Sequence, residues 1–174
     1  MPRHYSEYNT RYTQQLLDTL ADKTVSPAEY RQAMTSLGES FGDIFRKKIP
    51  DSQSNIYLAS TVEDADYLAK GILSRLETNY HSISFACFWN QRFSPFDVSD
   101  LKVAPILKKY QEPINSKVNY LIIVKSIISG ACVVKTNLTN LIQKIEPEQI
   151  FVVAPVIYEG AEEKLKAEFE KETY

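Results

Sequence analysis

The sequence VNYLIIVKSIISGACVVKTNL, residues Val118 to Leu138, indicates the centre of the fold. It contains an unbroken apolar run, Tyr120 to Val124, which is rich in β-branched residues and typical of a strand buried on both faces. Ser129, Gly130 and Ala131 follow, and they supply a helix N-cap and room for close backbone approach. Apolar residues then recur at helical spacing: Val133, Val134, Leu138, Leu141, Ile142 and Ile145. The stretch therefore predicts a strand, a tight loop and a helix in succession.

This turn is a candidate phosphate-binding site, because ligands of open α/β sheets bind at the carboxyl ends of parallel strands. The first N–H groups of the following helix have no partner within the helix, so they favour an anion. The candidate residues are Lys125, Ser126, Ser129, Gly130, Ala131 and Cys132. Lys125 either faces this pocket or reaches a carboxylate, and the two alternatives are equally weighted. Asn137, in the first turns of the helix, is expected to be a solvated helix position.

The cysteine content predicts neither a disulfide framework nor a zinc site. Cys87 and Cys132 both lie in apolar contexts, where a reduced, buried thiol is the usual state. Cys132 could act as a nucleophile, because a helix start stabilises a thiolate. The only histidines are His4 and His81, and neither is near Cys132 in the sequence, so a small buried residue is the favoured interpretation.

Length and composition predict one domain, residues 1–174. With 44% hydrophobic residues, a chain of 174 residues can bury a sizeable core without disulfides or a metal. The 20 basic and 22 acidic residues give a net charge of −2, so the overall charge attracts neither nucleic acid nor an anionic membrane. No apolar run approaches the length of a membrane span, about 20 residues, and the N-terminus lacks the apolar core of a signal peptide. We therefore expect a cytoplasmic protein with no nucleic-acid or membrane partner.

Residues 1–49 are expected to form an N-terminal helical segment. A first apolar stripe at helical spacing consists of Tyr5, Tyr8, Tyr12, Leu16 and Leu20. A second helix begins with Ser26 as N-cap, Pro27 at the first helical position and Glu29 closing a capping box. Two such stripes would leave a large exposed patch unless they are covered, so we expect them to pack on the body or across a homodimer or partner-subunit interface.

Residues 50–174 are expected to form an α/β core. Strands are predicted at Asn55–Ala59, Ser82–Asn90 and Gln149–Ile157, in addition to the central one. Helices are predicted after Ser60 and over Gly160–Glu172. Strands that alternate with helices predict a three-layer α/β sandwich with a mainly parallel sheet.

The segment from Gln91 to Lys117 shows no clear period. So long a connection within an α/β domain is usually a lid, an excursion or a subunit contact. Its basic residues Arg92, Lys108 and Lys109 are candidate loop contacts for a ligand.

The order of parts from Asn55 to Glu172 resembles the phosphoribosyltransferase fold, particularly its uracil phosphoribosyltransferase-like branch. In that family, the loop after a buried strand typically reads as two acidic residues, apolar residues and then Thr-Gly. It cups the 5-phosphate of phosphoribosyl pyrophosphate. Here VKSIISGACV occupies that place, and Ser129-Gly130 stands where Thr-Gly would stand. The resemblance implies a nucleotide or phosphorylated ribose as ligand.

The sequence departs from the family pattern at both ends of that substrate. The places of the paired carboxylates fall on Val124-Lys125 or Lys125-Ser126, and Lys125 there would repel Mg²⁺. After the first strand, Glu63 and Asp64 would repel a pyrophosphate. The sequence therefore predicts no metal site, and Mg²⁺ is expected as a cofactor only if Asp97 or Asp100 of the long segment restores one.

Three functions remain open from the sequence. The favoured one is a phosphoribosyltransferase-like protein with a degenerate site, which binds a nucleotide or phosphorylated ribose or acts as a regulatory or assembly subunit. The second is an active phosphoribosyltransferase that transfers phosphoribose to a nucleobase, with Thr136 joining the phosphate site and Lys109 or Arg92 stabilising the pyrophosphate. The third is an unrelated parallel α/β module. A hydrolase would need a nucleophile elbow, and the chain has no G-x-S-x-G motif.

Overall fold

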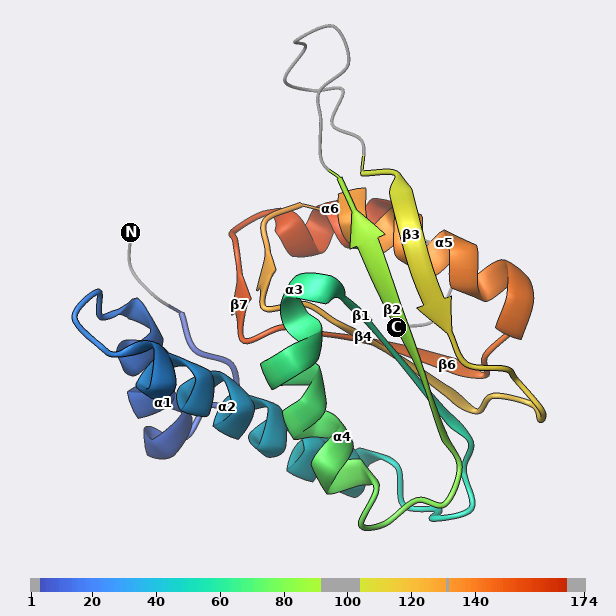
Figure 1. Ribbon diagram of the computed structural model, residues 1–174, viewed down its shortest axis with the longest axis horizontal. Coiled ribbons are helices and arrows are strands. Elements are labelled where there is room, and N and C mark those ends of the chain that lie inside the picture. Colours follow the sequence, from blue (N-terminus) through green and yellow to red (C-terminus); the bar gives the residue numbers. More distant parts are fainter. Residues whose placement is uncertain (1–3, 92–103, 131, 169–174) are drawn as a thin grey trace, which may run out of the picture.

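A five-stranded sheet in the order β3-β2-β1-β4-β6 forms the middle layer of the protein in the computed structural model (Figure 1). Its strands are β1 (Ile56–Thr61), β2 (Ile83–Asn90), β3 (Ile106–Gln111), β4 (Tyr120–Val124) and β6 (Gln149–Val153). All neighbours pair in parallel except β2 and β3, which are antiparallel. The structure describes residues 4–91, 104–130 and 132–168. The predicted mainly parallel sheet is confirmed.

The central strand of the prediction, β4, is an interior strand. It pairs with β1 on one side and β6 on the other, with Ser60 opposite Val124 at the carboxyl end. Every β4 residue after Tyr120 is buried, which explains why the sequence carries a continuous apolar run there instead of an alternating one.

The antiparallel edge strand β3 falls within the segment for which no period was recognised. Its residues 107–110 are all exposed, so the strand has no buried side to produce an apolar alternation. Hydrophobic periodicity therefore cannot detect an exposed edge strand of this kind.

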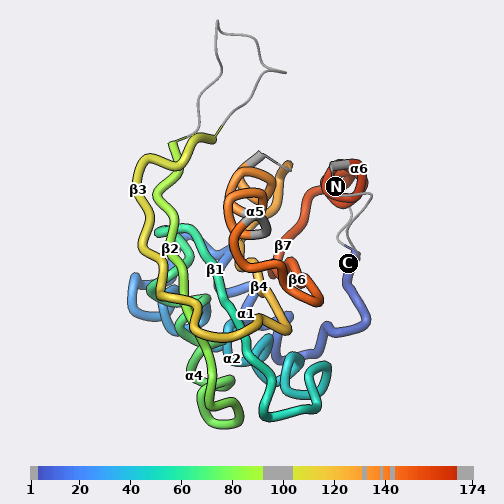
Figure 2. Tube along the Cα trace, turned by 90° about the vertical axis from the view of Figure 1, so that its right-hand side faces the viewer, coloured from blue at the N-terminus to red at the C-terminus, as the bar shows by residue number. Residues whose placement is uncertain are grey.

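Helices cover both faces of the sheet (Figures 1 and 2). One face packs against α2 (Pro27–Lys48), the short α3 (Val62–Asp64), the π-helical turn η1 (Ala65–Ala69) and α4 (Lys70–Leu76). The other face packs against α5 (Cys132–Ile145) and α6 (Ala161–Glu168). Each face has its own apolar cluster: Leu58, Leu68, Ile72 and Ile122 belong to the first, and Tyr57, Phe88, Leu121 and Leu141 to the second.

The capping box predicted at Ser26 is present, with Pro27 at the start of α2. The first helix, α1 (Arg11–Ala21), begins later than its apolar stripe suggested, so the prediction that Tyr5 and Tyr8 lie on it is wrong. Thr10 and Thr13 form a capping box that starts α1, and both tyrosines precede it. Tyr5, Tyr8 and Tyr12 are 44–53% exposed, whereas Leu16, Leu17 and Leu20 pack against the first apolar cluster.

Helices α2 and α4 approach closely through glycines. A Cβ atom added to Gly71 would lie 2.2 Å from the carbonyl oxygen of Thr35, and one added to Gly38 would lie 2.2 Å from that of Leu68. Neither position can accept a side chain without a backbone shift, so these glycines set the distance between the helices.

A second, two-stranded parallel sheet lies beyond the ends of β4 and β6. It consists of β5 (Ile127–Ile128) and β7 (Val156–Ile157). The strand predicted over Gln149–Ile157 is therefore interrupted after Val153, where Ala154 and Pro155 separate β6 from β7. Pairing of β5 with β7 holds the loop after β4 against the chain that follows β6.

Candidate functional site

The candidate site lies where the connections of the sheet diverge. From β1 the chain crosses to β2 through α3, η1 and α4, and from β4 it crosses to β6 through α5 on the opposite face. The carboxyl ends of β1 and β4 therefore form a topological switch point, the usual ligand position in open α/β sheets. Thr61 ends β1, and Lys125 directly follows β4.

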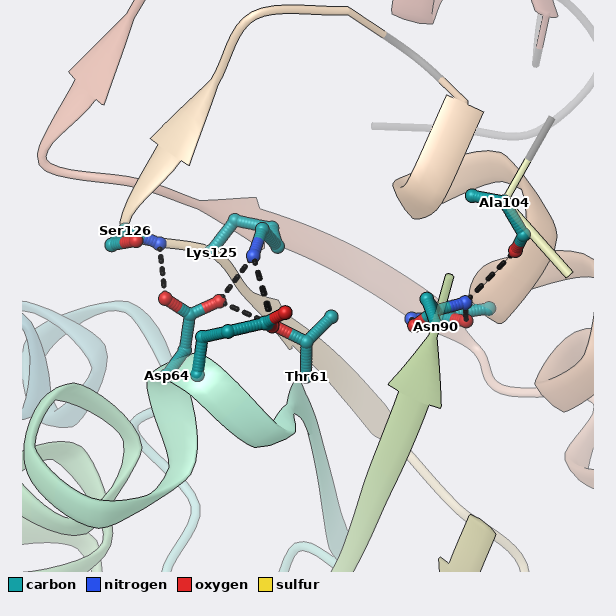
Figure 3. A network of polar contacts seen from close by, with 8 residues as sticks. Thr61, Asp64, Asn90, Ala104, Lys125 and Ser126 are labelled. Atoms are coloured by element: carbon teal, nitrogen blue, oxygen red, sulfur yellow. Dashed lines mark hydrogen bonds and ion pairs between the residues drawn. The ribbon is translucent and has the colours of Figure 1, made fainter. Parts of the chain in front are cut away.

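Lys125 and Asp64 form an ion pair at this switch point (Figure 3). Lys125 Nζ lies 2.5 Å from Asp64 Oδ2 and donates to Thr61 Oγ1 at 2.9 Å. The Thr61 hydroxyl in turn donates to Asp64 Oδ2 at 2.7 Å, and the Ser126 backbone N–H donates to Asp64 Oδ1 at 3.0 Å. The two loops that leave β1 and β4 are thus joined by one polar cluster.

The ion pair is nearly inaccessible to water. Lys125 is 7% exposed, and Asp64 and Thr61 are each 2% exposed. Charges at this depth require a partner of opposite sign and hydrogen bonds to the remaining donors and acceptors, and both carboxylate oxygens of Asp64 have them. Of the two alternatives for Lys125, the structure shows the contact with a carboxylate. Glu63 adds a second carboxylate, with its Oε2 4.0 Å from Lys125 Nζ.

Backbone geometry places the members of this cluster. Asp64 ends the single turn α3, directly before the π-helical turn η1. The backbone N–H of Lys125 donates to the carbonyl of Val153 at 3.0 Å. This bond extends the pairing of β4 with β6 by one hydrogen bond and fixes the position of the Lys125 backbone. The sequence shows Asp64 as an acidic residue in a helix's first turn, and only the pairing of β1 with β4 brings it to Lys125.

The space between the strand ends and α5 is filled. The residues around it are Ala59, Ser60, Thr61, Phe88, Ile123, Val124, Lys125, Val133, Val134 and Asn137. They leave no volume for a water-sized molecule. A ligand can therefore enter this space only if some of these residues move.

The loop between Ser126 and the start of α5 is more open. The Ile128 carbonyl accepts the Tyr158 N–H at 2.8 Å, which anchors its middle. Ser129 is exposed, and a Cβ atom added to Gly130 would have no heavy atom of the described residues within 4 Å, its chain neighbours apart. Ala131 and the side chain of Cys132 lie outside the described part of the chain.

Asn137 is buried, so its interpretation as a solvated helix position is wrong. It is 4% exposed and exchanges two hydrogen bonds with the side chain of Asn90, at 2.8 and 3.0 Å. Asn90 Nδ2 also donates to the carbonyl of Ala104 (Figure 3). This amide pair joins α5 to the end of β2. The sequence carried a signal for this burial, because Asn137 lies on a helix face whose other residues, Val133, Val134 and Leu141, are apolar.

The basic candidates of the long segment have contacts on β2 and α5. Lys108 Nζ lies 5.5 Å from the centre of the Trp89 ring, and Lys109 Nζ donates to Asn140 Oδ1 at 3.1 Å. The neighbouring Lys144, followed by partial burial, lowers the pKa of Lys109. Arg92 lies outside the described residues.

Cys87 is the buried thiol that the sequence predicted. It is 6% exposed, and burial, followed by the charges of Asp66, Glu63 and Asp64, raises the pKa of its thiol. A raised pKa leaves little thiolate at neutral pH, so Cys87 is a packing residue.

The described residues do not fit a Mg²⁺ ion. Within residues 4–91, 104–130 and 132–168, no three His, Cys, Asp or Glu side chains are grouped to hold a metal. At the switch point, the Lys125 ammonium contacts the carboxylate that a metal would require. Asp97 and Asp100 lie outside the described residues. In the same part of the chain, no helix combines the length and hydropathy needed to cross a membrane.

Comparisons with known proteins rest on structure alone, since no protein-family model and no curated sequence matches this chain. The AQ2163 protein from Aquifex aeolicus superposes with a TM-score of 0.74 at 13% identity, over 98% of this chain and 83% of that one. Adenine phosphoribosyltransferase from Saccharomyces cerevisiae gives 0.52 at 9% identity, over 94% and 97%. Hypoxanthine phosphoribosyltransferase from Staphylococcus aureus gives 0.50 at 14% identity, over 74% and 65%. The chain therefore has an α/β fold of the phosphoribosyltransferase type.

Proposed function

We propose that this protein binds a nucleotide or a phosphorylated ribose without transferring phosphoribose. The observation that carries the proposal is the buried Lys125–Asp64 ion pair at the switch point. The pair lies where open α/β sheets usually bind their ligand. Its two charged side chains bind each other, so neither is available for the charged groups of a reacting substrate.

Two features argue against turnover. The crevice has no free volume, so a sugar ring would have to displace residues of its lining, Lys125 among them. The cluster also offers no Mg²⁺ site, and phosphoribosyl transfer with loss of pyrophosphate relies on a cation that neutralises the leaving group. The site is thus degenerate as an enzyme site in this proposal.

Anion binding is supported by the loop before α5. The first N–H groups of this 14-residue helix lack helical acceptors, and the exposed Ser129 and the small Gly130 lie shortly before them in the chain. In this proposal a single phosphate binds here, with Ser129, Gly130, Ala131 and Cys132 supplying backbone donors and Lys125 lying at the base of the loop, while the backbone N–H of Ser126 remains bonded to Asp64.

The proposal includes a role as a cytoplasmic regulatory or assembly subunit, with a second copy or a partner protein. Exposed apolar side chains support it: Ile127, Val156, Ile157 and Tyr158, all on or beside the β5–β7 sheet, are 39–60% exposed. The uracil phosphoribosyltransferase-like branch of the resemblance makes a uridine nucleotide the first ligand to test.

The test combines binding and turnover measurements. Thermal unfolding is followed with phosphoribosyl pyrophosphate, ribose 5-phosphate and nucleoside monophosphates, UMP included, each with and without Mg²⁺. A ligand that binds the folded state must raise the melting temperature. Pyrophosphate release from phosphoribosyl pyrophosphate is then measured with a panel of nucleobases. We expect a phosphate monoester to stabilise the protein and no base to support turnover.

Gly130→Val tests the loop, and Gly130→Ala is its graded control. The valine branches over the open side of the loop and should abolish the ligand-induced shift, whereas a single Cβ meets no neighbour and should weaken it less. Robust pyrophosphate release overturns the absence of turnover. Failure of every phosphate ligand to shift the melting temperature at millimolar concentration overturns the binding role.

A further inference from the structure

A second hollow, with a volume of about 530 Å³, lies between the α1–α2 connection, the first turns of α2 and the π-helical turn η1. Its size falls within the range of about 300–1,000 Å³ that is usual for small-molecule sites. It shares no lining residue with the switch-point crevice. An inference about this hollow is therefore independent of the proposed function.

Part of the lining of the hollow is apolar and aromatic. Val25 and Tyr67 are half-buried, and Tyr30 is 43% exposed. Aromatic side chains with one accessible side offer large, rigid contact area to a flat ligand. The walls thus favour an aromatic or otherwise planar molecule over a compact polar one.

Arg31 supplies a positioned cation at the edge of these walls. Its guanidinium carbon lies 5.9 Å from the centre of the Tyr67 ring, within the range of a cation–π contact. Packing of the guanidinium on a ring restrains its plane, and the N–H donors on the edge of that plane match the geometry of a carboxylate or phosphate. Lys23 adds a second positive charge to the lining.

Among the described residues that line the hollow, Asp22 is the only acidic one, and it is hydrogen-bonded to Thr24. Its Oδ1 accepts the backbone N–H of Thr24 at 2.8 Å and the Thr24 hydroxyl at 2.7 Å. These hydrogen bonds, the side-chain one first, lower the pKa of Asp22, so its carboxylate stays ionised and shapes the α1–α2 connection. With Lys23 and Arg31 against Asp22, the lining has a net charge of +1 and favours an anion.

The π-helical turn gives a second, structural reason to regard this surface as a site. Tyr67 is the middle residue of η1, where one extra residue per turn is accommodated between α3 and α4. Leu68 and Ala69 of the same turn are fully buried, so the turn separates a core side from the side that carries Tyr67. Single π turns within helices occur frequently at functional sites.

We infer that this hollow binds a small, flat aromatic molecule with a negatively charged group, which stacks on Tyr30 and pairs with Arg31, the guanidinium that lies over the Tyr67 ring. The apolar and aromatic side chains alone favour any flat apolar molecule, and the cations alone favour any anion. Together they favour a ligand that has both properties.

The test uses 1-anilinonaphthalene-8-sulfonate, a flat aromatic anion that fluoresces when bound, and its uncharged counterpart N-phenyl-1-naphthylamine. Each is titrated into the 174-residue protein and three variants: Arg31→Gln, Tyr30→Ala and, as a control on β3, Tyr110→Ala, whose side chain is 52% exposed. Melting temperatures of the variants check that they fold, which exposed side chains should permit.

We expect Arg31→Gln to weaken the anion about tenfold, because a hydrogen-bonded charge pair is lost, and to leave the uncharged probe unaffected. Tyr30→Ala should weaken both probes, and Tyr110→Ala neither. The inference is overturned if Arg31→Gln and Tyr30→Ala bind the anion like the wild type. It is equally overturned if Tyr110→Ala weakens the anion as much as they do.

Discussion

The ammonium of Lys125 lies 2.5 Å from Oδ2 of Asp64, across 61 positions of sequence. The contact joins the residue after β4 to the turn after β1. The two buried charges at the switch point therefore neutralise each other. The ion pair can be tested through the stability of the protein and through metal binding.

Replacing Lys125 with Met should destabilise the protein by about 3–5 kcal/mol, because Asp64 would keep a buried charge without its cation. Urea-induced unfolding measures the change. Lys117→Met is the matched control, since Lys117 lies 2.6 Å from Glu148 but the two side chains are 69% and 48% exposed. A surface pair of this kind contributes at most about 1 kcal/mol. Equal losses from the two substitutions would show that the Lys125 pair is not buried in solution.

Replacing Lys125 with Ser should create a binding site for Mn²⁺ that the wild-type protein lacks. The substitution removes the ammonium and leaves the oxygen atoms of Asp64, Thr61 and Glu63, which lay 2.5, 2.9 and 4.0 Å from it. Hard oxygen ligands are what Mn²⁺ and Mg²⁺ prefer. Isothermal titration calorimetry measures the gain, and the double variant Lys125→Ser with Asp64→Asn should lose it. Tight Mn²⁺ binding by the wild type would contradict the view that Lys125 occupies a cation position.

Gly71→Ala should destabilise the protein by several kcal/mol, whereas Gly130→Ala should be nearly neutral. The new Cβ at Gly71 would lie 2.2 Å from the Thr35 carbonyl oxygen, so α2 and α4 must separate. At Gly130 the same atom meets no atom of the part of the chain that the structure describes within 4 Å, apart from its chain neighbours. Thermal and chemical unfolding measure the stability of the two variants, in which the same substitution, glycine to alanine, is made in different surroundings. If both variants are neutral, the two helices do not pack as closely as described.

Stability should fall as pH rises from about 10 to about 12, in part because of Tyr57. Its side chain is fully buried, its hydroxyl donates to the Glu112 carbonyl at 3.2 Å, and burial, followed by the charges of Glu112 and Tyr110, raises its pKa from 10.0 to about 12. The folded state thus holds the phenol proton more tightly than the unfolded chain does. This contribution is complete below pH 10 and is lost as pH rises through 12.

Tyr57→Phe isolates that contribution to alkaline unfolding. The variant has no phenol to ionise at this position, so its unfolding free energy should decline less steeply between pH 10 and pH 12 than that of the wild type. Urea unfolding at a series of pH values gives both curves. Parallel curves would show that Tyr57 titrates alike in the folded and unfolded states.

Deletion of residues 1–49 should give insoluble or partly unfolded protein. Leu37, Phe45 and Ile49 are at most 4% exposed and belong to the same apolar cluster as Leu58 and Ile122 of the sheet. Their removal uncovers part of this cluster, since only η1 and α4 would still cover that face of β1 and β4. Near-ultraviolet circular dichroism and size-exclusion chromatography report the outcome. A folded, monomeric truncation would mean that the α/β core is independent of its N-terminal helices.

The sequence by itself determined the elements whose cause is local. The β-branched run of β4 predicts an interior strand because burial on both faces removes polar residues from it, and the strand is interior. The start of α2 follows from Ser26, Pro27 and Glu29, which satisfy helix donors within one turn. Alternation of strands and helices was enough to predict a mainly parallel sheet, since right-handed crossovers leave few other arrangements.

Only the tertiary structure decided which side chains meet. The partner of Lys125, the burial of Asn137 against Asn90 and the contact of Gly38 with Gly71 all join segments that the sheet order and helix packing bring together. Edge strand β3 has no buried side to mark it in the sequence, and its pairing with β2 alone defines it. A local pattern records which residues are buried, because burial depends on residue type, but it does not record partners, because these depend on strand register and crossover. The sequence therefore identified Lys125 as a candidate site residue, and only the tertiary structure showed that its charge is paired with Asp64.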